Sequence, residues 1–240
     1  MKGTVYVCSS PERRRAIAGA LRAGPDPPEV RTLSGTPSRL EHHHTSVLVI
    51  DLRDPHPVEP VESSRLGQGL AAAGVVLIGA SKQSVPAGWL EVARQPNVQL
   101  LLTSPGDKMD EARLRSTVLQ VLERSVERAV AGALRRCGHR FETFQDLVRA
   151  VVADPWGIRR PRDLARVLGV SLPALRHMCE PLGLGRTDHV LTYIRWCAYE
   201  YLTVECHMSS ARALEAVGVR DRSNFRRQVR RARAGRRRSS

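Results

Sequence analysis

The chain has 240 residues, of which 42% are apolar and only 4% aromatic, and its formal net charge is +14. This length and apolar content predict one or two folded domains with ordinary hydrophobic cores. The scarcity of aromatic side chains argues against proteins that bind RNA or single strands by stacking bases on rings, and the positive charge favours double-stranded DNA as the partner.

The first half of the chain alternates short apolar runs with helical or polar segments. A strand is predicted at Val5–Cys8, and a helix opens at Pro11 with Ile17 and Leu21 on its apolar face. Further strands are predicted at Glu29–Leu33, Ser46–Ile50, Val75–Gly79 and Val98–Leu102. Because the run Ser46–Ile50 is apolar on both faces, it should lie in the middle of a parallel sheet, in which five strands alternate with helical or loop segments.

Asp51 follows the third predicted strand directly, and Pro55 comes four residues later. In this arrangement residues 1–108 resemble the receiver domain of two-component response regulators. The resemblance implies a five-stranded, flavodoxin-like α/β fold. It also makes Asp51 the candidate phospho-acceptor, since that family phosphorylates the aspartate at the end of the third strand.

Several functional groups of that family are replaced in this chain. Cys8, Ser9 and Ser10 stand where the acidic pair that holds Mg²⁺ is expected, and Ser104 stands in place of the lysine after the fifth strand. We therefore expect a non-phosphorylated, receiver-like sensory domain that binds a small ligand or a protein partner at the ends of its strands. A phosphorylation-switched response regulator that uses Asp51 is the alternative.

No enzymatic or metal site is predicted. Ser9 and Ser10 have no general base at a recognisable spacing, and the chain has no Gly-rich phosphate loop. The run His42–His44 lacks the Cys or carboxylate residues that would complete a metal site. We expect neither catalysis nor a cofactor.

Residues 109–138 form a predicted amphipathic helix that connects the two halves. Some of its apolar residues are spaced alternately by three and four, as at the seam between two helices. The seam residues are Leu119, Leu122, Val126, Ala129 and Ala133. Two interpretations stay open: a homodimer through this helix, or a helix that covers the sheet of its own chain and then leads into the next domain.

Almost all of the net charge lies in the second half. Residues 125–240 contain 23 Lys and Arg against 11 Asp and Glu, a balance of +12, whereas residues 1–124 contain 15 against 13, a balance of +2. A genome-wide preference for arginine would load both halves alike. The excess therefore favours neutralisation of DNA phosphates by the second half.

Residues 139–235 contain two predicted helix-turn-helix motifs. In the first, a helix stops at Gly169 and the next is capped by the hydroxyl of Ser171. The residues expected to pack inward are Leu172, Leu175 and Met178. Those left on the outer surface are Pro173, Arg176 and His177.

The second motif is the more specific of the two. A short helix stops at Gly218, and Asp221 can accept hydrogen bonds from the first turn of the helix that follows. On that helix Phe225 and Val229 are spaced to face inward. The outward residues are Arg222, Asn224, Arg226, Arg227 and Arg230.

An apolar helix at Val190–Leu202 separates the motifs. Two such motifs joined by one long helix resemble the DNA-binding domain of the AraC/XylS family of transcription regulators. The residues that carry this resemblance are Leu164, Ala165, Gly169, Ser171, Leu175, Leu182, Gly183, Arg195, Ala198, Gly218, Asp221, Ser223 and Phe225. It implies an all-α domain that places one helix of each motif in adjacent segments of the major groove. Pro181 shortens the first of these helices, so weak base contacts are expected there.

The candidate DNA-binding residues are Ser171, Pro173, Arg176, His177, Arg220, Arg222, Ser223, Asn224, Arg226, Arg227 and Arg230. We expect base contacts from Arg222, Asn224 and Arg226, since Arg suits guanine and Asn suits adenine. The basic tail 236–240 should add nonspecific phosphate attraction. The sequence therefore predicts a sequence-specific, double-stranded DNA-binding transcriptional regulator. A nonspecific nucleoid or structural DNA-binding protein is the alternative.

The expected location is the cytoplasm, in association with the nucleoid. The cysteines have no paired spacing and are interpreted as small core residues in a reducing compartment. The N-terminus enters a strand at once without a signal-peptide pattern, and no apolar run approaches the length of a membrane span.

Overall fold

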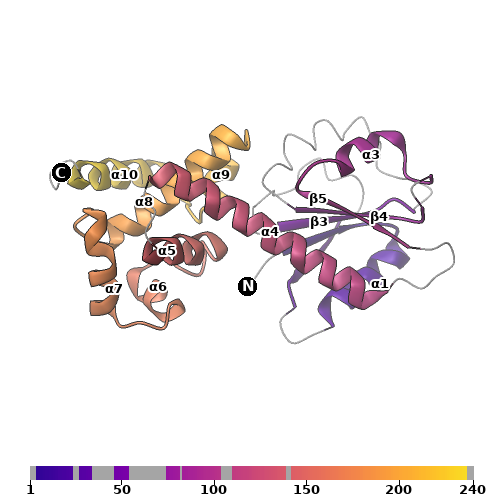
Figure 1. Cartoon of the computed structure of the whole chain (residues 1–240), viewed down its shortest axis with the longest axis horizontal. Helices are drawn as coiled ribbons and strands as arrows, with labels where there is room; N and C mark the ends of the chain where they lie inside the picture. The colour runs from indigo at the N-terminus through magenta and orange to yellow at the C-terminus, as the bar shows by residue number, and fades with distance from the viewer. Residues whose placement is uncertain are drawn as a thin grey trace. The chain divides into compact units, whose positions relative to one another are not determined.

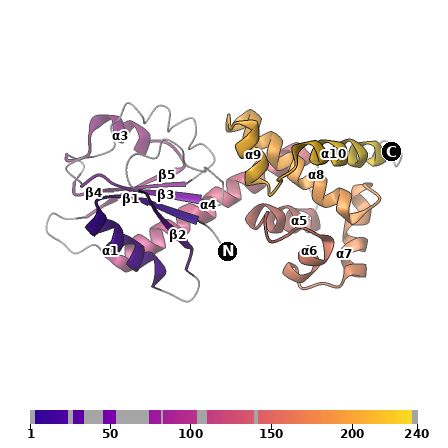
Figure 2. The same cartoon turned by 180° about the vertical axis from the view of Figure 1, so that it is seen from behind.

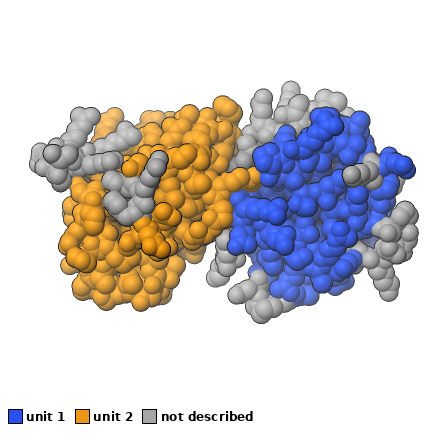
Figure 3. Space-filling view, viewed as in Figure 1, with its two compact units in different colours: residues 1–125 blue, residues 126–240 orange. Residues whose placement is uncertain are grey.

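The computed structural model describes residues 4–23, 27–33, 46–53, 74–81, 83–103, 110–138 and 142–236. Contacts between residues divide the chain into two compact units, Met1–Ser125 and Val126–Ser240, which Figure 3 colours separately. Each unit is described by itself. The predicted sites at His42–His44 and Pro55, and most of the basic tail, lie outside the described residues.

Unit 1 is built on one five-stranded parallel sheet. Its strands are β1 (Thr4–Cys8), β2 (Glu29–Leu33), β3 (Ser46–Asp51), β4 (Gly74–Gly79) and β5 (Val98–Leu102). The strand order is β2-β1-β3-β4-β5, and all four neighbouring pairs are parallel. The predicted strands and the flavodoxin-like α/β fold are confirmed. In this order the direction of winding switches between β1 and β3, and open parallel sheets generally bind ligands outside the carboxyl ends of the strands at such a point.

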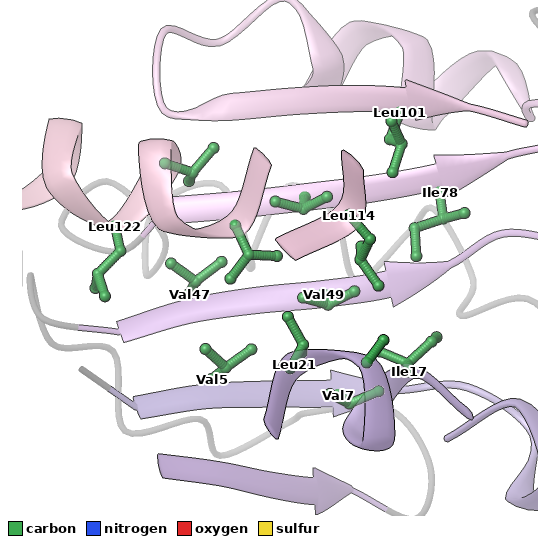
Figure 4. Close-up of a cluster of buried hydrophobic side chains, with 14 residues drawn as sticks. Val5, Val7, Ile17, Leu21, Val47, Val49, Ile78, Leu101, Leu114 and Leu122 are labelled. Carbon is green, nitrogen blue, oxygen red and sulfur yellow. The ribbon is translucent and has the colours of Figure 1, made fainter. Parts of the chain in front are cut away.

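Helices cover both faces of this sheet (Figures 1 and 2). The helices α1 (Pro11–Arg22) and α4 (Glu111–Cys137) lie on one face, and α3 (Ala87–Ala93) lies on the other. Alternate strand residues supply the two cores, because successive side chains of a strand point to opposite faces. Figure 4 shows the first core, where Val47 and Val49 of β3 contact the layer formed by Ile17, Leu21 and Leu114. Leu48 and Ile50 face the second core, around Trp89.

The helix α4 contributes to both units. Its residues Leu114, Val118 and Leu122 are buried in the core of unit 1, whereas Val126 and Ala129 are buried with unit 2. The predicted dimer seam is therefore wrong as an exposed surface: of its five residues, only Leu119 is not fully buried by the chain itself. The second interpretation describes α4 better. A homodimer stays a prediction and would need another surface.

Unit 2 is helical and is organised around α8. After α4 its elements are α5 (Glu142–Ala153), α6 (Pro161–Val167), α7 (Leu172–Cys179), the 3₁₀ turn η1 (Glu180–Leu182), α8 (Thr187–Glu200), the π-helical turn η2 (Tyr201–Glu205), α9 (Ser210–Ala216) and α10 (Arg222–Arg236). The central helix α8 contacts α5, α6, α7, α9 and α10. Both predicted helix-turn-helix pairs are present, α6 with α7 and α9 with α10 (Figure 1).

Three further observations concern the cysteines, metal sites and membrane spans. All five cysteines are buried free thiols, which confirms their interpretation as core residues. In the part of the chain that the structure describes, no group of three or more His, Cys, Asp or Glu side chains is placed to hold a metal ion. None of the helices in the same ranges is both long enough and apolar enough to cross a bilayer.

Candidate nucleic-acid interface

The turn of the second helix-turn-helix motif depends on Gly218. The amide of Gly218 donates to the carbonyl of Glu215 at 2.9 Å, and that of Val219 donates to the carbonyl of Leu214 at 2.8 Å. These two bonds close α9 as a Schellman motif, which requires a left-handed residue; the φ of Gly218 is 73°. A Cβ at this position would also overlap the carbonyl oxygen of Pro155. The position therefore requires glycine on two independent grounds.

The helix that follows is capped as predicted. The carboxylate Oδ1 of Asp221 accepts a hydrogen bond from the amide of Asn224 at 2.9 Å, which satisfies one free donor of the first turn of α10. Beyond this cap the outward side chains are all exposed. They are Arg222, Ser223, Asn224, Arg226, Arg227 and Arg230.

The inner face of α10 packs on aromatic residues of α8. Phe225 and Val229 are 4% and 5% exposed, as predicted. The ring of Phe225 lies 6.2 Å from that of Trp196 and 6.4 Å, edge-on, from that of Tyr199. In a chain with few aromatic residues, this cluster fixes which face of α10 is buried, and so which face is presented outward.

The first motif repeats the same local geometry. Gly169 has a φ of 67°, and the amide of Val170 donates to the carbonyl of Ala165 at 2.9 Å, so α6 also ends in a Schellman motif. The hydroxyl of Ser171 then accepts from the amide of Ala174 at 3.3 Å and caps α7. The two motifs are therefore built by the same capping chemistry, which supports their assignment as a pair.

On α7 the inward pattern is only partly as predicted. Leu175 is buried and Met178 is half-buried, but Leu172 is 42% exposed, so its predicted inward packing is wrong. Leu172 is the first residue of α7, one helical turn before the buried Leu175. The predicted contact residues Ser171, Pro173, Arg176 and His177 are all exposed.

The imidazole of His177 lies 3.0 Å from the carboxylate of Glu180. The α-helix ends at Cys179, two residues before Pro181. The outer surface of α7 is therefore both shorter than that of α10 and less positive.

The loop formed by residues 154–160, between α5 and α6, contacts the central helix and the second motif. The guanidinium Nη2 of Arg195, on α8, donates to the carbonyl oxygens of Pro155 and Ile158. Burial, together with the nearby charge of Arg159, lowers the pKa of Arg195. Gly218 also abuts the carbonyl group of Pro155, so this loop contacts both α8 and the turn of the second motif. Arg195 was singled out only through the family resemblance, and its structural role is to fasten this loop.

The strand ends of unit 1 form a separate polar site around Asp51. The Asp51 side chain is fully buried, and Arg53 donates to both of its oxygens at 2.8 Å, from Nε and from Nη2. Ser9 donates to the same carboxylate at 3.3 Å, and a guanidinium nitrogen of Arg13 lies 4.0 Å away. The hydrogen bond to Asp51 raises the pKa of the Arg53 guanidinium above its ordinary value.

Arg53 was not identified from the sequence as a partner of Asp51. The turn after β3 folds this arginine back onto the carboxylate. Its Nη1 also donates to the hydroxyl of Thr103 at 3.2 Å. The sequence signal that could have revealed it is the i to i+2 spacing of an acid and an arginine at a strand end.

Comparisons with known proteins do not establish a family. No protein-family model matches the chain, and no curated protein matches it. Among solved structures, the response regulator StyR is 16% identical, with coverage of 96% of this chain and 99% of that chain and a TM-score of 0.42. Full-length FixJ from B. japonicum is 12% identical, with coverage of 98% of each chain and a TM-score of 0.42.

A third structure, the response regulator ChrA of a heme-sensing two-component system, is 15% identical over 97% of this chain and 98% of that chain, with a TM-score of 0.32.

Proposed function

We propose that the chain is a sequence-specific, double-stranded DNA-binding transcriptional regulator whose helical unit is of the AraC/XylS type. The observation that carries this proposal is the outer face of α10, where Arg222, Asn224 and Arg226 are exposed on a capped helix directly after a tight turn. A helix presented in this way fits the major groove of B-DNA, which admits one α-helix. Such a regulator would act in the cytoplasm, on the nucleoid.

The side chains of α10 divide into two groups by position. Arg222, Asn224 and Arg226 lie near the start of the helix, where recognition helices meet base edges. We assign guanine contacts to the two arginines and an adenine contact to the asparagine. Arg220, Ser223, Arg227 and Arg230 are assigned to phosphates, which supply most of the binding energy but carry no sequence information.

We assign the helix α7 a secondary role in base recognition. It is short, and its exposed first turn is apolar, with Leu172 and Pro173 beside the capping Ser171. Apolar side chains can contact thymine methyl groups but cannot form the bidentate hydrogen bonds that discriminate best between bases. Arg176 and His177 remain for backbone or limited base contacts.

Selection of binding sites from random double-stranded DNA tests the proposal. The wild-type chain should enrich one motif, and Asn224→Ala should lose about tenfold discrimination at one position of that motif. The matched variant Arg227→Ala should weaken all sequences alike and lower the salt slope of binding by about one. A wild-type chain that enriches no motif would favour the alternative, a nonspecific nucleoid protein.

We propose that unit 1 is a receiver-like sensory or partner-binding domain that is not switched by phosphorylation. Supporting this is the bidentate pair of Asp51 with Arg53, which occupies both oxygens of the acceptor carboxylate. Ser9 also stands where an acidic Mg²⁺ ligand would be needed. Incubation with acetyl phosphate and Mg²⁺ should leave the intact mass unchanged. A gain of one phosphoryl group that Asp51→Asn abolishes would restore the phosphorylation-switched alternative.

A further inference from the structure

Two exposed arginines from distant parts of unit 2 meet at one tryptophan. The guanidinium carbon of Arg220, in the turn of the second motif, lies 5.2 Å from the centroid of the Trp156 ring. That of Arg159 lies 5.9 Å from the same centroid, and its Nε donates to the carbonyl oxygen of Trp156 at 3.1 Å. Both distances fall within the range of cation–π attraction. We call Trp156, Arg159 and Arg220 the Trp156 cluster.

The tryptophan is held in place from several directions. Asp154 accepts a hydrogen bond from the amide of Gly157 at 2.8 Å, which closes the loop around the tryptophan. Arg195 fixes the loop from the side of α8, and Gly218 packs against Pro155 from the side of the second motif. The backbone that carries the ring therefore has a defined position relative to the turn that carries Arg220. A ring on a backbone held in this way can position both guanidinium groups before any ligand binds.

The positive charge of the Trp156 cluster is not neutralised by a salt bridge within the described residues. No carboxylate there lies within 4.0 Å of the guanidinium groups of Arg159, Arg195 or Arg220. Trp156 and Arg220 also line an open pocket of about 470 Å³. Glu215 also lines this pocket, so its lining holds one arginine and one glutamate. Two exposed arginines that meet at one ring, neither of them in a salt bridge within these residues, point to an anionic ligand.

We propose that the Trp156 cluster is a binding site for one phosphodiester group of DNA, with Trp156 as a positioning residue. This inference rests on the proposed function. An arginine guanidinium matches the geometry of phosphate oxygens and stacks well on an aromatic ring, so both properties are used at once. Because the ring restrains the two side chains beforehand, less conformational entropy is lost when the phosphate binds. The cluster would anchor the DNA backbone beside the turn that sets α10 in the groove.

The test is binding of the full chain to a selected duplex and to a scrambled duplex, measured by fluorescence anisotropy over a series of salt concentrations. Arg159→Ala and Arg220→Ala should each weaken both duplexes about three- to tenfold and lower the salt slope by about one. Arg149→Ala is the matched control. This substitution also removes one positive charge, but from an exposed arginine that pairs with Glu127. It should leave the slope unchanged. Equal behaviour of all three variants would overturn the proposal.

Substitution of the ring separates positioning from general structure. Trp156→Leu should weaken both duplexes about threefold, and Trp156→Phe, which keeps an aromatic face, should restore most of the loss. Thermal unfolding identifies a variant that fails to fold, in which case the two arginine variants still decide the question. A loss with phenylalanine as large as that with leucine would remove the cation–π role.

Free phosphate is the other source of the same ligand chemistry. If the cluster binds DNA, replacing chloride with orthophosphate at equal ionic strength should weaken the wild-type chain more than the double variant Arg159→Ala/Arg220→Ala. If orthophosphate stabilises the chain thermally while the double variant binds both duplexes normally, the site takes free phosphate and the inference is wrong. Failure of the wild-type chain to bind any duplex would instead contradict the proposed function.

Discussion

Arg53 donates two hydrogen bonds of 2.8 Å to the carboxylate of Asp51, whose side chain is fully buried at the end of β3. The pair forms because the turn after the strand returns the arginine to the residue two positions earlier. It neutralises a charge that would otherwise be costly in the interior of the sheet. Both oxygens of the buried carboxylate are therefore engaged by one guanidinium.

Removal of the acid alone should destabilise unit 1. In Asp51→Asn the guanidinium of Arg53 keeps its charge and loses its partner, which should cost about 3 kcal/mol of unfolding free energy, measured by urea denaturation. The double variant Asp51→Asn/Arg53→Met should recover a large part of this loss. Glu91→Gln is the control, because its pair with Arg94 has both side chains mostly exposed and should cost less than about 0.5 kcal/mol. Equal costs for the two single variants would contradict a buried ionic role.

The sequence predicted the sheet well because its signals are local. Apolar runs in β3 and β4, and the proline and glycine residues around them, define buried parallel strands without knowledge of their neighbours. The caps of α7 and α10 were predictable for the same reason, since Ser171 and Asp221 act within three residues. The dimer seam was wrong because periodicity shows that a face is apolar, not which surface covers it. The Trp156 cluster was missed because Arg220 reaches Trp156 across more than sixty positions of sequence.

Gly132 lies within α4, where the absence of a side chain leaves room for a neighbouring aromatic ring. A Cβ at this position of α4 would overlap the ring of Tyr201 in η2. Glycine in a helix ordinarily costs about 1 kcal/mol relative to alanine, but here it provides the space for the ring. Gly132→Ala should therefore lower the unfolding free energy by about 1 kcal/mol or more, through overpacking.

The matched control for Gly132 is in α1. No atom lies within 4 Å of a Cβ built on Gly19, so Gly19→Ala should raise stability by up to about 1 kcal/mol. In the double variant Gly132→Ala/Tyr201→Leu the loss caused by alanine should largely disappear. Both glycine variants can be compared by thermal and urea unfolding. Stabilisation by both substitutions would show that Tyr201 does not pack on Gly132.

Two leucines of α7 should lose different amounts of unfolding free energy when they are truncated. Leu175 is fully buried, so Leu175→Ala should cost about 3 kcal/mol of unfolding free energy. Leu172 is 42% exposed, so Leu172→Ala should cost less than about 1 kcal/mol and instead affect DNA binding. Urea unfolding of the two variants measures the difference. Similar costs at both positions would restore the inward packing that was first predicted for Leu172.

Glu205 should make the stability of unit 2 depend on pH in the acid range. Hydrogen bonds from Arg135 at 2.7 Å and from Arg136 at 3.0 Å join this residue of η2 to the end of α4. The bond from Arg135 above all, aided by that from Arg136 and opposed by partial desolvation, holds the pKa of Glu205 below its ordinary value of 4.5. The folded state therefore binds a proton at this site less readily than the unfolded state.

It follows that the contribution of Glu205 is complete above about pH 4.5 and is lost as the pH falls through the lower pKa of the folded state. Because the side chain is one-third exposed, solvent screening limits this contribution to about 1 kcal/mol or less. Glu205→Gln should thus be slightly less stable than wild type at neutral pH, and the difference should vanish in acid. A difference in urea midpoint that stayed constant as the pH was lowered would show that the arginines do not stabilise the ionised carboxylate.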